Sequence, residues 1–304
     1  MSSQQIVLVT GSNSGFGRRI VETLARQGHR VFASMRAING RNASAATELR
    51  DLAQREHLAL SVLNLDVTDE ASVKQAVQTV LEQAGRLDVV VNNAGVTSAG
   101  ITEGYTLEQA RAHMDVNFFG PLKVDRAVLP RMRQQRNGLL IHMSSLSGGL
   151  VTPFIALYSA SKAALEALAE TYHYELAPLG IESIIIEPGI FATELLKSQQ
   201  DPQDQERLAS YGALKDIPAQ ILRNTAAMQE GPVAQDPQIV ADVVANLITQ
   251  PRGTRSLRTI PGAYDSGLTT LNEAKAQAQR ALLESMGLTE ALAFRIPEAS
   301  TSEK

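Results

Sequence analysis

The clearest chemical signal in this sequence is a tyrosine and a lysine four residues apart, Tyr158 and Lys162. On a helix this spacing brings both side chains to the same face. A phenol is a weak acid at neutral pH, and a neighbouring ammonium group favours its anion. We expect a general acid/base that protonates a carbonyl oxygen or deprotonates an alcohol. The alternative for an isolated pair is a half-buried tyrosine beside a lysine that reaches the surface.

A glycine-rich turn near the N-terminus is the second chemical signal. Gly11, Gly15 and Gly17 follow an apolar run and precede a segment of helical period. Glycines let the backbone approach a pyrophosphate, and a helix N-terminus offers free N–H groups and the positive end of its dipole. Between a first strand and a first helix, such a turn predicts a dinucleotide site.

Short β-branched runs alternate with longer segments of helical period along the chain. We expect strands at residues 6–9, 30–34, 60–65, 87–91, 139–142, 181–186 and 257–260. Helices are expected near 16–26, 69–84, 106–134, 156–178 and 237–249. The inner strands are almost continuously apolar, which is typical of parallel strands buried on both faces. The pattern predicts an α/β protein with a Rossmann-type, doubly wound parallel sheet in three α/β/α layers.

Taken together, these motifs resemble the short-chain dehydrogenase/reductase family, in its compact, single-domain branch. The resemblance runs from residue 6 to about 195, and the strand ending at Arg36 is also similar to hydroxysteroid and retinol dehydrogenase-like members. The matching residues appear in family order: the turn 10–17, Asn92-Asn93-Ala94-Gly95, Asn117, Ser145, Tyr158, Lys162 and Pro188-Gly189.

The resemblance assigns roles to the catalytic candidates. Tyr158 is the general acid/base, Lys162 also binds the nicotinamide ribose, Ser145 polarises the substrate oxygen and Asn117 holds a water in the proton relay. Because side chains alternate along a strand, only one of Ser144 and Ser145 should face the site. The spacing to Tyr158 favours Ser145, with Ser144 as the alternative.

The resemblance also implies the cofactor contacts, with Asp66 and Val67 near the adenine. Asp66 has an alternative role in starting the next helix, for which Thr68 is the better cap. The residues expected to bind the cofactor are Gly11, Ser12, Asn13, Ser14, Gly15, Phe16, Gly17, Arg36, Asp66, Val67, Asn93, Ala94, Gly95, Tyr158, Lys162, Pro188, Gly189, Ile190 and Thr193.

The end of the second strand favours NADP(H) over NAD(H). NAD-specific members usually carry an Asp there that binds the ribose hydroxyls, and Met35 stands at or near that position. Arg36 offers a charge-assisted contact to a 2′-phosphate, and Ser12 and Asn13 offer further polar contacts. The alternative is that Arg36 is simply an exposed residue.

Residues 1–265 are expected to form the Rossmann-fold dehydrogenase domain, with a helical substrate lid at about 190–235. Residues 266–304 should form a C-terminal extension, helical over 269–286 and frayed over 298–304. The lid's apolar residues fit a pocket for a bulky apolar alcohol or ketone, and equally the inward faces of two amphipathic helices. These residues are Phe191, Leu195, Leu196, Leu208, Tyr211, Leu214, Ile217, Ile221, Leu222 and Met228.

Composition excludes several classes of function. With 28 basic and 32 acidic residues the net charge is −4, which disfavours a nucleic-acid partner. Cysteine is absent, and the five histidines show no metal-ligand spacing, so no metal is expected. No signal peptide and no apolar run of membrane length is evident, which favours a cytoplasmic protein without a membrane partner.

The sequence thus predicts an NADP(H)-dependent oxidoreductase of the carbonyl reductase type, which interconverts a ketone or aldehyde and an alcohol by hydride transfer. The alternative is a catalytically silent, NADP(H)-binding regulatory protein, which would have no need of the intact set of catalytic residues. The resemblance also implies a homodimer or homotetramer that acts on a small-molecule substrate.

Overall fold

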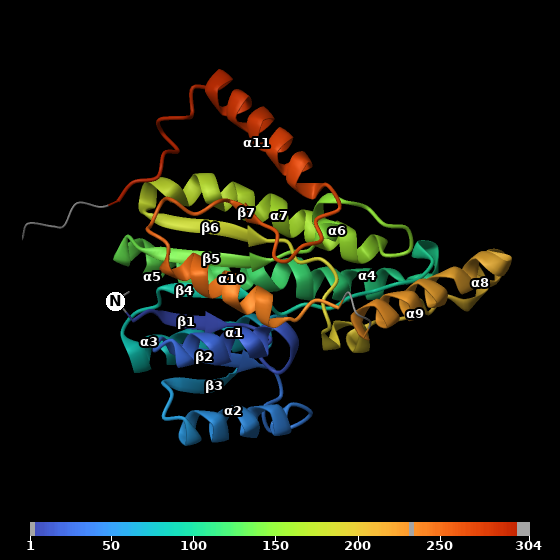
Figure 1. The fold of residues 1–304 in the computed structure, drawn as a ribbon, viewed down its shortest axis with the longest axis horizontal. Coiled ribbons are helices and arrows are strands. Elements are labelled where there is room, and N and C mark those ends of the chain that lie inside the picture. The colour runs from blue at the N-terminus through green and yellow to red at the C-terminus, as the bar shows by residue number, and fades with distance from the viewer. Residues whose placement is uncertain (1–3, 231–233, 297–304) are drawn as a thin grey trace, which may run out of the picture.

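The sheet is the frame of the molecule. The computed structural model describes residues 4–230 and 234–296, and within them the chain forms a seven-stranded, all-parallel sheet in the order β3-β2-β1-β4-β5-β6-β7 (Figure 1). The strand order reverses between β1 and β4, which confirms the expected doubly wound, Rossmann-type α/β fold in a single domain. The strands are β1 (Ile6–Val9), β2 (Arg30–Met35), β3 (Leu60–Asn64), β4 (Val89–Asn92), β5 (Gly138–Met143), β6 (Ile181–Ile186) and β7 (Arg258–Thr259).

Helices cover both faces of this sheet. Val7 and Val9 belong to the apolar core that contains α1, α2 and α10, whereas Leu8 belongs to the core on the other face, with α3, α5 and the end of α7. This is the alternation expected of parallel strands buried on both sides. The helices are α1 (Gly15–Arg26), α2 (Ala43–Arg55), α3 (Glu70–Ala84), α4 (Leu107–Met114), α5 (Gly120–Gln135), α6 (Leu146–Gly149), α7 (Ala156–Leu176), α8 (Gln205–Ser210), α9 (Ile217–Glu230), α10 (Gln238–Thr249) and α11 (Leu268–Ser285).

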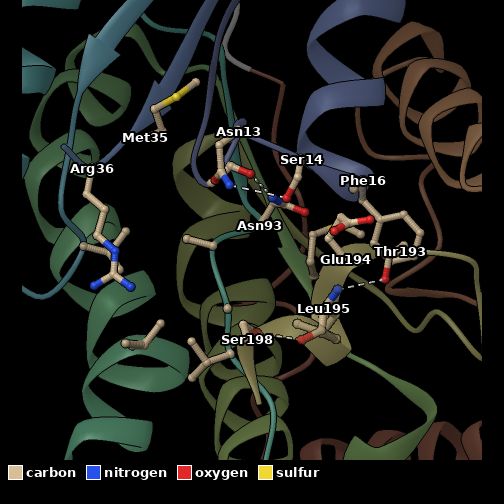
Figure 2. Close-up of a pocket in the computed structure, with 18 of the residues that line it drawn as sticks. Asn13, Ser14, Phe16, Met35, Arg36, Asn93, Thr193, Glu194, Leu195 and Ser198 are labelled. Atoms are coloured by element: carbon tan, nitrogen blue, oxygen red, sulfur yellow. Dashed lines mark hydrogen bonds between the residues drawn. The ribbon is translucent and has the colours of Figure 1, made fainter. Parts of the chain in front are cut away.

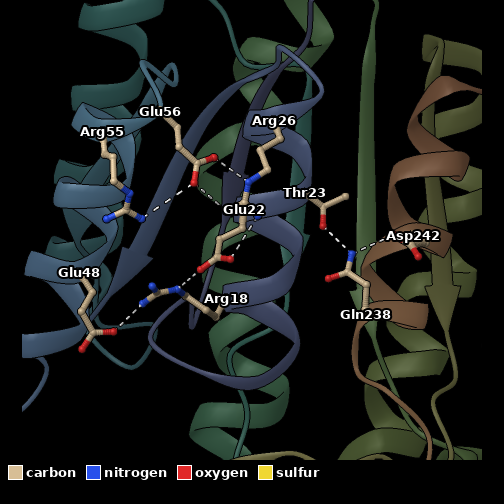
Figure 3. A network of polar contacts seen from close by, with 9 residues as sticks. All are labelled: Arg18, Glu22, Thr23, Arg26, Glu48, Arg55, Glu56, Gln238 and Asp242. Atoms are coloured by element: carbon tan, nitrogen blue, oxygen red, sulfur yellow. Dashed lines mark hydrogen bonds and ion pairs between the residues drawn. The ribbon is translucent and has the colours of Figure 1, made fainter.

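Polar contacts join α1, α2 and α10, the three helices on one face of the sheet, at their outer surface (Figure 3). Arg26 of α1 pairs with Glu56 at the end of α2, with 2.8 Å between Nε and Oε2. On the other side of α1, Gln238 of α10 donates to the Thr23 hydroxyl at 2.8 Å. Exposed ion pairs of this kind contribute roughly 0–1 kcal/mol each to stability. The buried apolar faces therefore stabilise this layer of helices, and the polar contacts fix how the helices align with one another.

Two helical predictions needed correction. α2 is not among the expected helices. The long helix expected over 106–134 is divided into α4, a π-helical segment Asp115–Phe119, and α5. Such π-helical turns are common at functional sites, and this one carries Asn117.

The cap of α3 also differs from the expectation. Asp69, rather than Thr68, is the N-cap, and its carboxylate accepts from the N–H groups of Ala71 and Ser72 at 2.8 and 3.3 Å. The Thr68 hydroxyl donates to Asp66 Oδ1 at 2.8 Å, so it is committed to the preceding turn.

The region after β6 consists of short helices, as expected. It contains the 3-10 helices Glu194–Ser198 and Gly212–Asp216 together with α8 and α9, which extend away from the sheet (Figure 1). The predicted C-terminal helix is α11, whose first residue, Leu268, is fully buried. The expected frayed tail at 298–304 lies outside the described residues. Over the part of the chain that the structure describes, no helix has both the length and the apolar character that a bilayer crossing requires.

Candidate active site

A cavity of about 570 Å³ opens at the carboxyl ends of the central strands, at the point where the strand order reverses. It is lined by the turn after β1, the end of β2, the turn after β4, the end of β5, one face of α7 and the 3-10 helix Glu194–Ser198 (Figure 2). Ligands of open α/β sheets bind at this position.

The turn after β1 needs glycine for two different reasons. Gly11 has φ +68°, and a Cβ there would lie 2.8 Å from Ala94 Cα. A Cβ on Gly17 would lie 2.3 Å from the carbonyl oxygen of Gly11 and 2.5 Å from Asn93 Nδ2. The backbone of this turn therefore contacts the turn after β4 directly, which side chains would prevent.

Hydrogen bonds lock these two turns together. Asn93 Nδ2 donates to the carbonyl oxygens of Thr10 and Gly11 at 2.8 and 3.1 Å. The Thr10 hydroxyl accepts from the N–H groups of Asn93 and Ala94, both at 3.0 Å. Asn93, Ala94 and Gly95 all line the cavity, as expected.

The N-terminus of α1 faces the cavity without a side-chain cap. Ser14 is the N-cap residue and makes no capping hydrogen bond, although Asn13 Nδ2 approaches its hydroxyl at 3.3 Å. The uncapped first turn leaves N–H groups for an anion. Asn13, Ser14, Gly15 and Phe16 line the cavity. Ser12 does not, because it is fully buried and its hydroxyl donates to the carbonyl oxygen of Val9 at 2.9 Å.

Two arginines stand where the second strand ends. Arg36 and Arg41 line the cavity together with Met35, Asp66 and Val67. Arg36 Nη1 lies 4.0 Å from Asp66 Oδ2. Arg41 is not among the expected residues. It lies in the turn before α2, whose existence the sequence pattern did not indicate.

Tyr158 and Lys162 both line the cavity from the same face of α7. Lys162 Nζ donates to the carbonyl oxygen of Met143 at 2.7 Å and lies 5.7 Å from the centre of the Tyr158 ring. The ammonium group is therefore held by the end of β5, over the ring of the phenol.

Asn117 is brought to the same region by the π-helical segment. Its Oδ1 accepts from the Val96 N–H, and its Nδ2 donates to the Val96 carbonyl oxygen, both at 2.9 Å. Nδ2 also donates to the Ser161 hydroxyl at 3.0 Å. Asn117 is buried and fixes the backbone of Val96, which lines the cavity.

The structure distinguishes the two adjacent serines. The Ser144 hydroxyl turns to Glu166 Oε1 at 2.7 Å. The Ser145 hydroxyl hydrogen-bonds to Tyr158 and accepts from the N–H of Ser147 at 3.2 Å. Ser145 therefore lies beside the tyrosine, whereas Ser144, the alternative, is the one of the two that lines the cavity.

The protonation of this centre differs from the sequence-based expectation. Burial raises the pKa of Tyr158, and the hydrogen bond to Ser145 only partly opposes it, so the phenol is neutral at physiological pH. Burial also lowers the pKa of Lys162 to about 8, and the charge of Glu166 opposes that shift. The expected lowering of the tyrosine pKa by Lys162 is wrong for this state, because desolvation dominates and the ammonium group is held by Met143.

A histidine outside the predicted site lies beside the tyrosine. The His113 ring is edge-on to Tyr158 at 6.3 Å between ring centres. Burial, helped by the charge of Lys162, lowers the pKa of His113 to about 4, so the imidazole is neutral. Four residues separate it from Asn117, and its Nε2 lies 3.1 Å from Asn117 Nδ2.

The segment after β6 is only partly in the cavity. Thr193 lines it, as expected, whereas Pro188, Gly189 and Ile190 do not. Glu194, Leu195, Lys197 and Ser198, which the motifs did not indicate, also line it. Phe191 packs edge-on against Phe16 at 5.4 Å between ring centres, which joins this segment to the glycine turn. Of the apolar residues expected to shape a substrate pocket, Leu195 lines this cavity, whereas Leu214, Ile217 and Met228 are exposed.

Comparison with known proteins agrees with this geometry. A family model described as short chain dehydrogenase matches residues 5–204. The chain is 37% identical over 190 residues to 3-ketodihydrosphingosine reductase of Bacteroides thetaiotaomicron, an alignment that covers 62% of this chain and 65% of that protein, just under two thirds of its length. It is 32% identical over 265 residues to retinol dehydrogenase 8 of Bos taurus, which covers 83% of this chain and 80% of that one. Among solved structures, a short-chain dehydrogenase from Streptomyces avermitilis superposes with a TM-score of 0.75 at 30% identity, over 94% of this chain and 97% of the other.

The protonation of Tyr158 can be checked in the cofactor-free protein by ultraviolet difference titration of phenolate, with Tyr158→Phe to identify its contribution. Because burial disfavours the anion, Tyr158 should titrate above the ordinary value of about 10. Ser145→Ala should raise this pKa further, because it removes the hydrogen bond that favours the anion. Titration of Tyr158 well below the ordinary value would contradict this description of the site.

Proposed function

The chain belongs to the short-chain dehydrogenase family of oxidoreductases, and on that premise we propose that it interconverts a ketone or aldehyde and an alcohol with NADP(H) as cofactor. One observation carries the proposal: the uncapped N-terminus of α1 and the Tyr158–Lys162 pair line the same cavity. A site that can bind an anion and a pair that can act as acid or base therefore lie in the same cavity.

The residues of the cavity fit a dinucleotide. The glycine turn packs its backbone against the turn after β4, where a Cβ would collide, and α1 offers free N–H groups to the cavity for a pyrophosphate. We propose that Asp66 and Val67 bind the adenosine half, and that Asn93, Lys162 and Thr193 bind the nicotinamide half. When bound, the cofactor supplies or accepts the hydride.

The chain's own residues would handle the proton. Tyr158 is neutral because its pKa is raised, so it can donate its proton to the oxygen of a carbonyl during reduction. Ser145, hydrogen-bonded to the same phenol, would polarise that oxygen. Lys162 would hold the cofactor ribose, and Asn117 would support the proton relay beside the Val96 backbone that it fixes.

The choice of NADP(H) rests on the charges around the end of β2. Met35 is apolar where an NAD-specific site needs a carboxylate, and Arg36 and Arg41 line the cavity beside it. Guanidinium groups make strong, charge-assisted contacts with phosphate. Asp66 lies 4.0 Å from Arg36 and orients it without replacing the missing carboxylate.

We therefore expect Arg36→Ala and Arg41→Ala each to weaken NADPH binding roughly tenfold, about 1.4 kcal/mol, and to leave NADH binding almost unchanged. Fluorescence titration of both cofactors measures this directly. Arg55→Ala is the matched control, because Arg55 lies on α2 and pairs with Glu56 outside the cavity. Equal losses for NADPH and NADH would refute the assignment.

The proposed substrate is a bulky apolar ketone or alcohol. The two relatives described above are named for a ketone of a sphingosine chain and for retinol. A homodimer or homotetramer is proposed as well, supported by the exposed apolar residues Leu107 and Phe119, which lie together on α4 and the π-helical segment.

The reductase proposal is tested by NADPH consumption with carbonyl compounds of increasing size, from glyceraldehyde through cyclohexanone to decalone, a steroid ketone and retinal. Turnover should increase with apolar size. Tyr158→Phe should lower kcat by at least about 100-fold, with little change in NADPH affinity.

The outcomes separate the alternatives. Undiminished turnover in Tyr158→Phe would contradict the role of the phenol, and better turnover of glyceraldehyde than of the larger ketones would contradict the apolar substrate. Tight NADPH binding without turnover in either direction would favour a regulatory protein.

A further inference from the structure

A buried glutamate lies directly behind the catalytic centre. Glu166 is on α7, one turn after Lys162 and two turns after Tyr158, a spacing that places the three side chains along one side of the helix. It is only 4% exposed. A carboxylate buried this deeply requires partners, and the identity of those partners indicates what it does.

One partner is the turn that carries Ser145. Glu166 Oε1 accepts from the Ser144 hydroxyl at 2.7 Å. A Cβ on Gly148 would lie only 2.1 Å from the same oxygen, so α6 packs its backbone onto the carboxylate. Glu166 therefore contacts both ends of the turn 144–148, and Ser145 lies between them.

The second partner is the charge of Lys162. Burial disfavours the ammonium form of Lys162, and the negative charge of Glu166 favours it. Glu166 is thus the neighbouring group that keeps a cavity-lining lysine charged toward neutral pH and above.

The other charges around Glu166 are balanced by a buried arginine. Arg258 of β7 lies 3.5 Å from Glu166 Oε2, 2.8 Å from Glu170 Oε2 and 3.6 Å from Glu187 Oε1. Burial works against the arginine's charge, but the hydrogen bond that Arg258 donates to Glu170 and the charges of the three carboxylates outweigh it and raise the pKa of Arg258. Burial and the charge of Glu166 together raise the pKa of Glu187 to about 7.

Helix α11 supplies the outer partners of this cluster, which consists of Glu166, Glu170, Glu187 and Arg258. Lys275 pairs with Glu170 at 2.7 Å, and Asn272 donates to Glu187 Oε2 at 2.7 Å. When the Glu166 charge is lost, Arg258 and Lys275 keep Glu170 and Glu187 as partners, so these two cations still face two carboxylates. A neutral, isosteric variant at position 166 should therefore fold.

We propose that Glu166 is a positioning residue of the catalytic centre, which holds the Ser144–Gly148 turn so that Ser145 meets Tyr158 and which places a negative charge one helical turn from Lys162. The proposal rests on the reductase function described above. Glu166 acts through a hydrogen bond to Ser144 and through its charge beside Lys162, and the charge can be removed while the hydrogen bond is kept.

Glu166→Gln keeps an oxygen acceptor for Ser144 but removes the charge, whereas Glu166→Ala removes both. Glu170→Gln is the control, because Glu170 contacts Arg258 and Lys275 and has no hydrogen bond or ion pair with Ser144 or Lys162 among the described contacts. Two readouts are used: NADPH affinity by fluorescence as a function of pH, and kcat with the best ketone of the panel. Circular dichroism checks that each variant is folded.

In the wild type, NADPH affinity should fall as pH rises through about 8, the pKa at which half of Lys162 has lost its proton. Removing the negative charge lowers the lysine pKa, so in Glu166→Gln this fall should begin about one pH unit lower. Its kcat near neutral pH should stay within a factor of about three, whereas kcat in Glu166→Ala should fall roughly 10- to 100-fold. Glu170→Gln should leave the pH dependence unchanged.

An unshifted pH dependence in Glu166→Gln, an equal shift in Glu170→Gln, or a wild-type kcat in folded Glu166→Ala would overturn the proposal. If the wild type binds NADPH but reduces no ketone, the reductase proposal fails. The pH dependence of binding then still decides the role of Glu166.

Discussion

The contact between two backbone turns is the constraint on which the rest of the site depends. The turn after β1 and the turn after β4 meet so closely that Gly11 has no room for a Cβ beside Ala94, and Asn93 donates to the backbone of both Thr10 and Gly11. The parallel sheet makes the contact available, because β1 and β4 are neighbours at the point where the strand order reverses. The contact fixes the uncapped end of α1 relative to the turn after β4, where a Cβ on Gly95 would lie 3.7 Å from Lys162 Nζ.

Much of the fold followed from sequence, because strands such as Ile6–Val9 are continuous apolar runs, which are typical of a sheet buried on both faces. Helix α2 was missed because the apolar periodicity of its sequence is weak. It buries only Ala46, Leu49 and Leu52, which alternate with charged residues along the chain. The motifs also indicated several residues that line the cavity, such as Gly15, Asn93 and Thr193. The choice between Ser144 and Ser145 stays a prediction, because Ser144 lines the cavity and Ser145 interacts with Tyr158. Arg41 was not indicated, because tertiary folding alone brings it to the cavity, and within residues 194–198 only Leu195 and Leu196 were expected to shape a pocket. The direction in which the pKa of Tyr158 shifts was predicted wrongly. The spacing of Tyr158 and Lys162 reveals a neighbouring charge but not the loss of solvent around the phenol.

Behind the cavity, the protein maintains a buried charge cluster that an apolar core would not need. Burying ions costs several kcal/mol each, and excellent geometry is required to offset that cost. Here the carboxylates surround Arg258, and their outer partners, Lys275 and Asn272, come from the C-terminal helix. The last third of the chain, which carries none of the sequence motifs, is in this way connected to the turn that positions Ser145.

Hydrogen–deuterium exchange with and without NADPH tests whether the cavity between the two turns is the cofactor site. We expect slower exchange in three separate segments that line one cavity: 10–18 after β1, 92–97 after β4 and 193–198 beyond β6. Protection confined to any other surface, or unchanged exchange in all three segments at saturating NADPH, would contradict it.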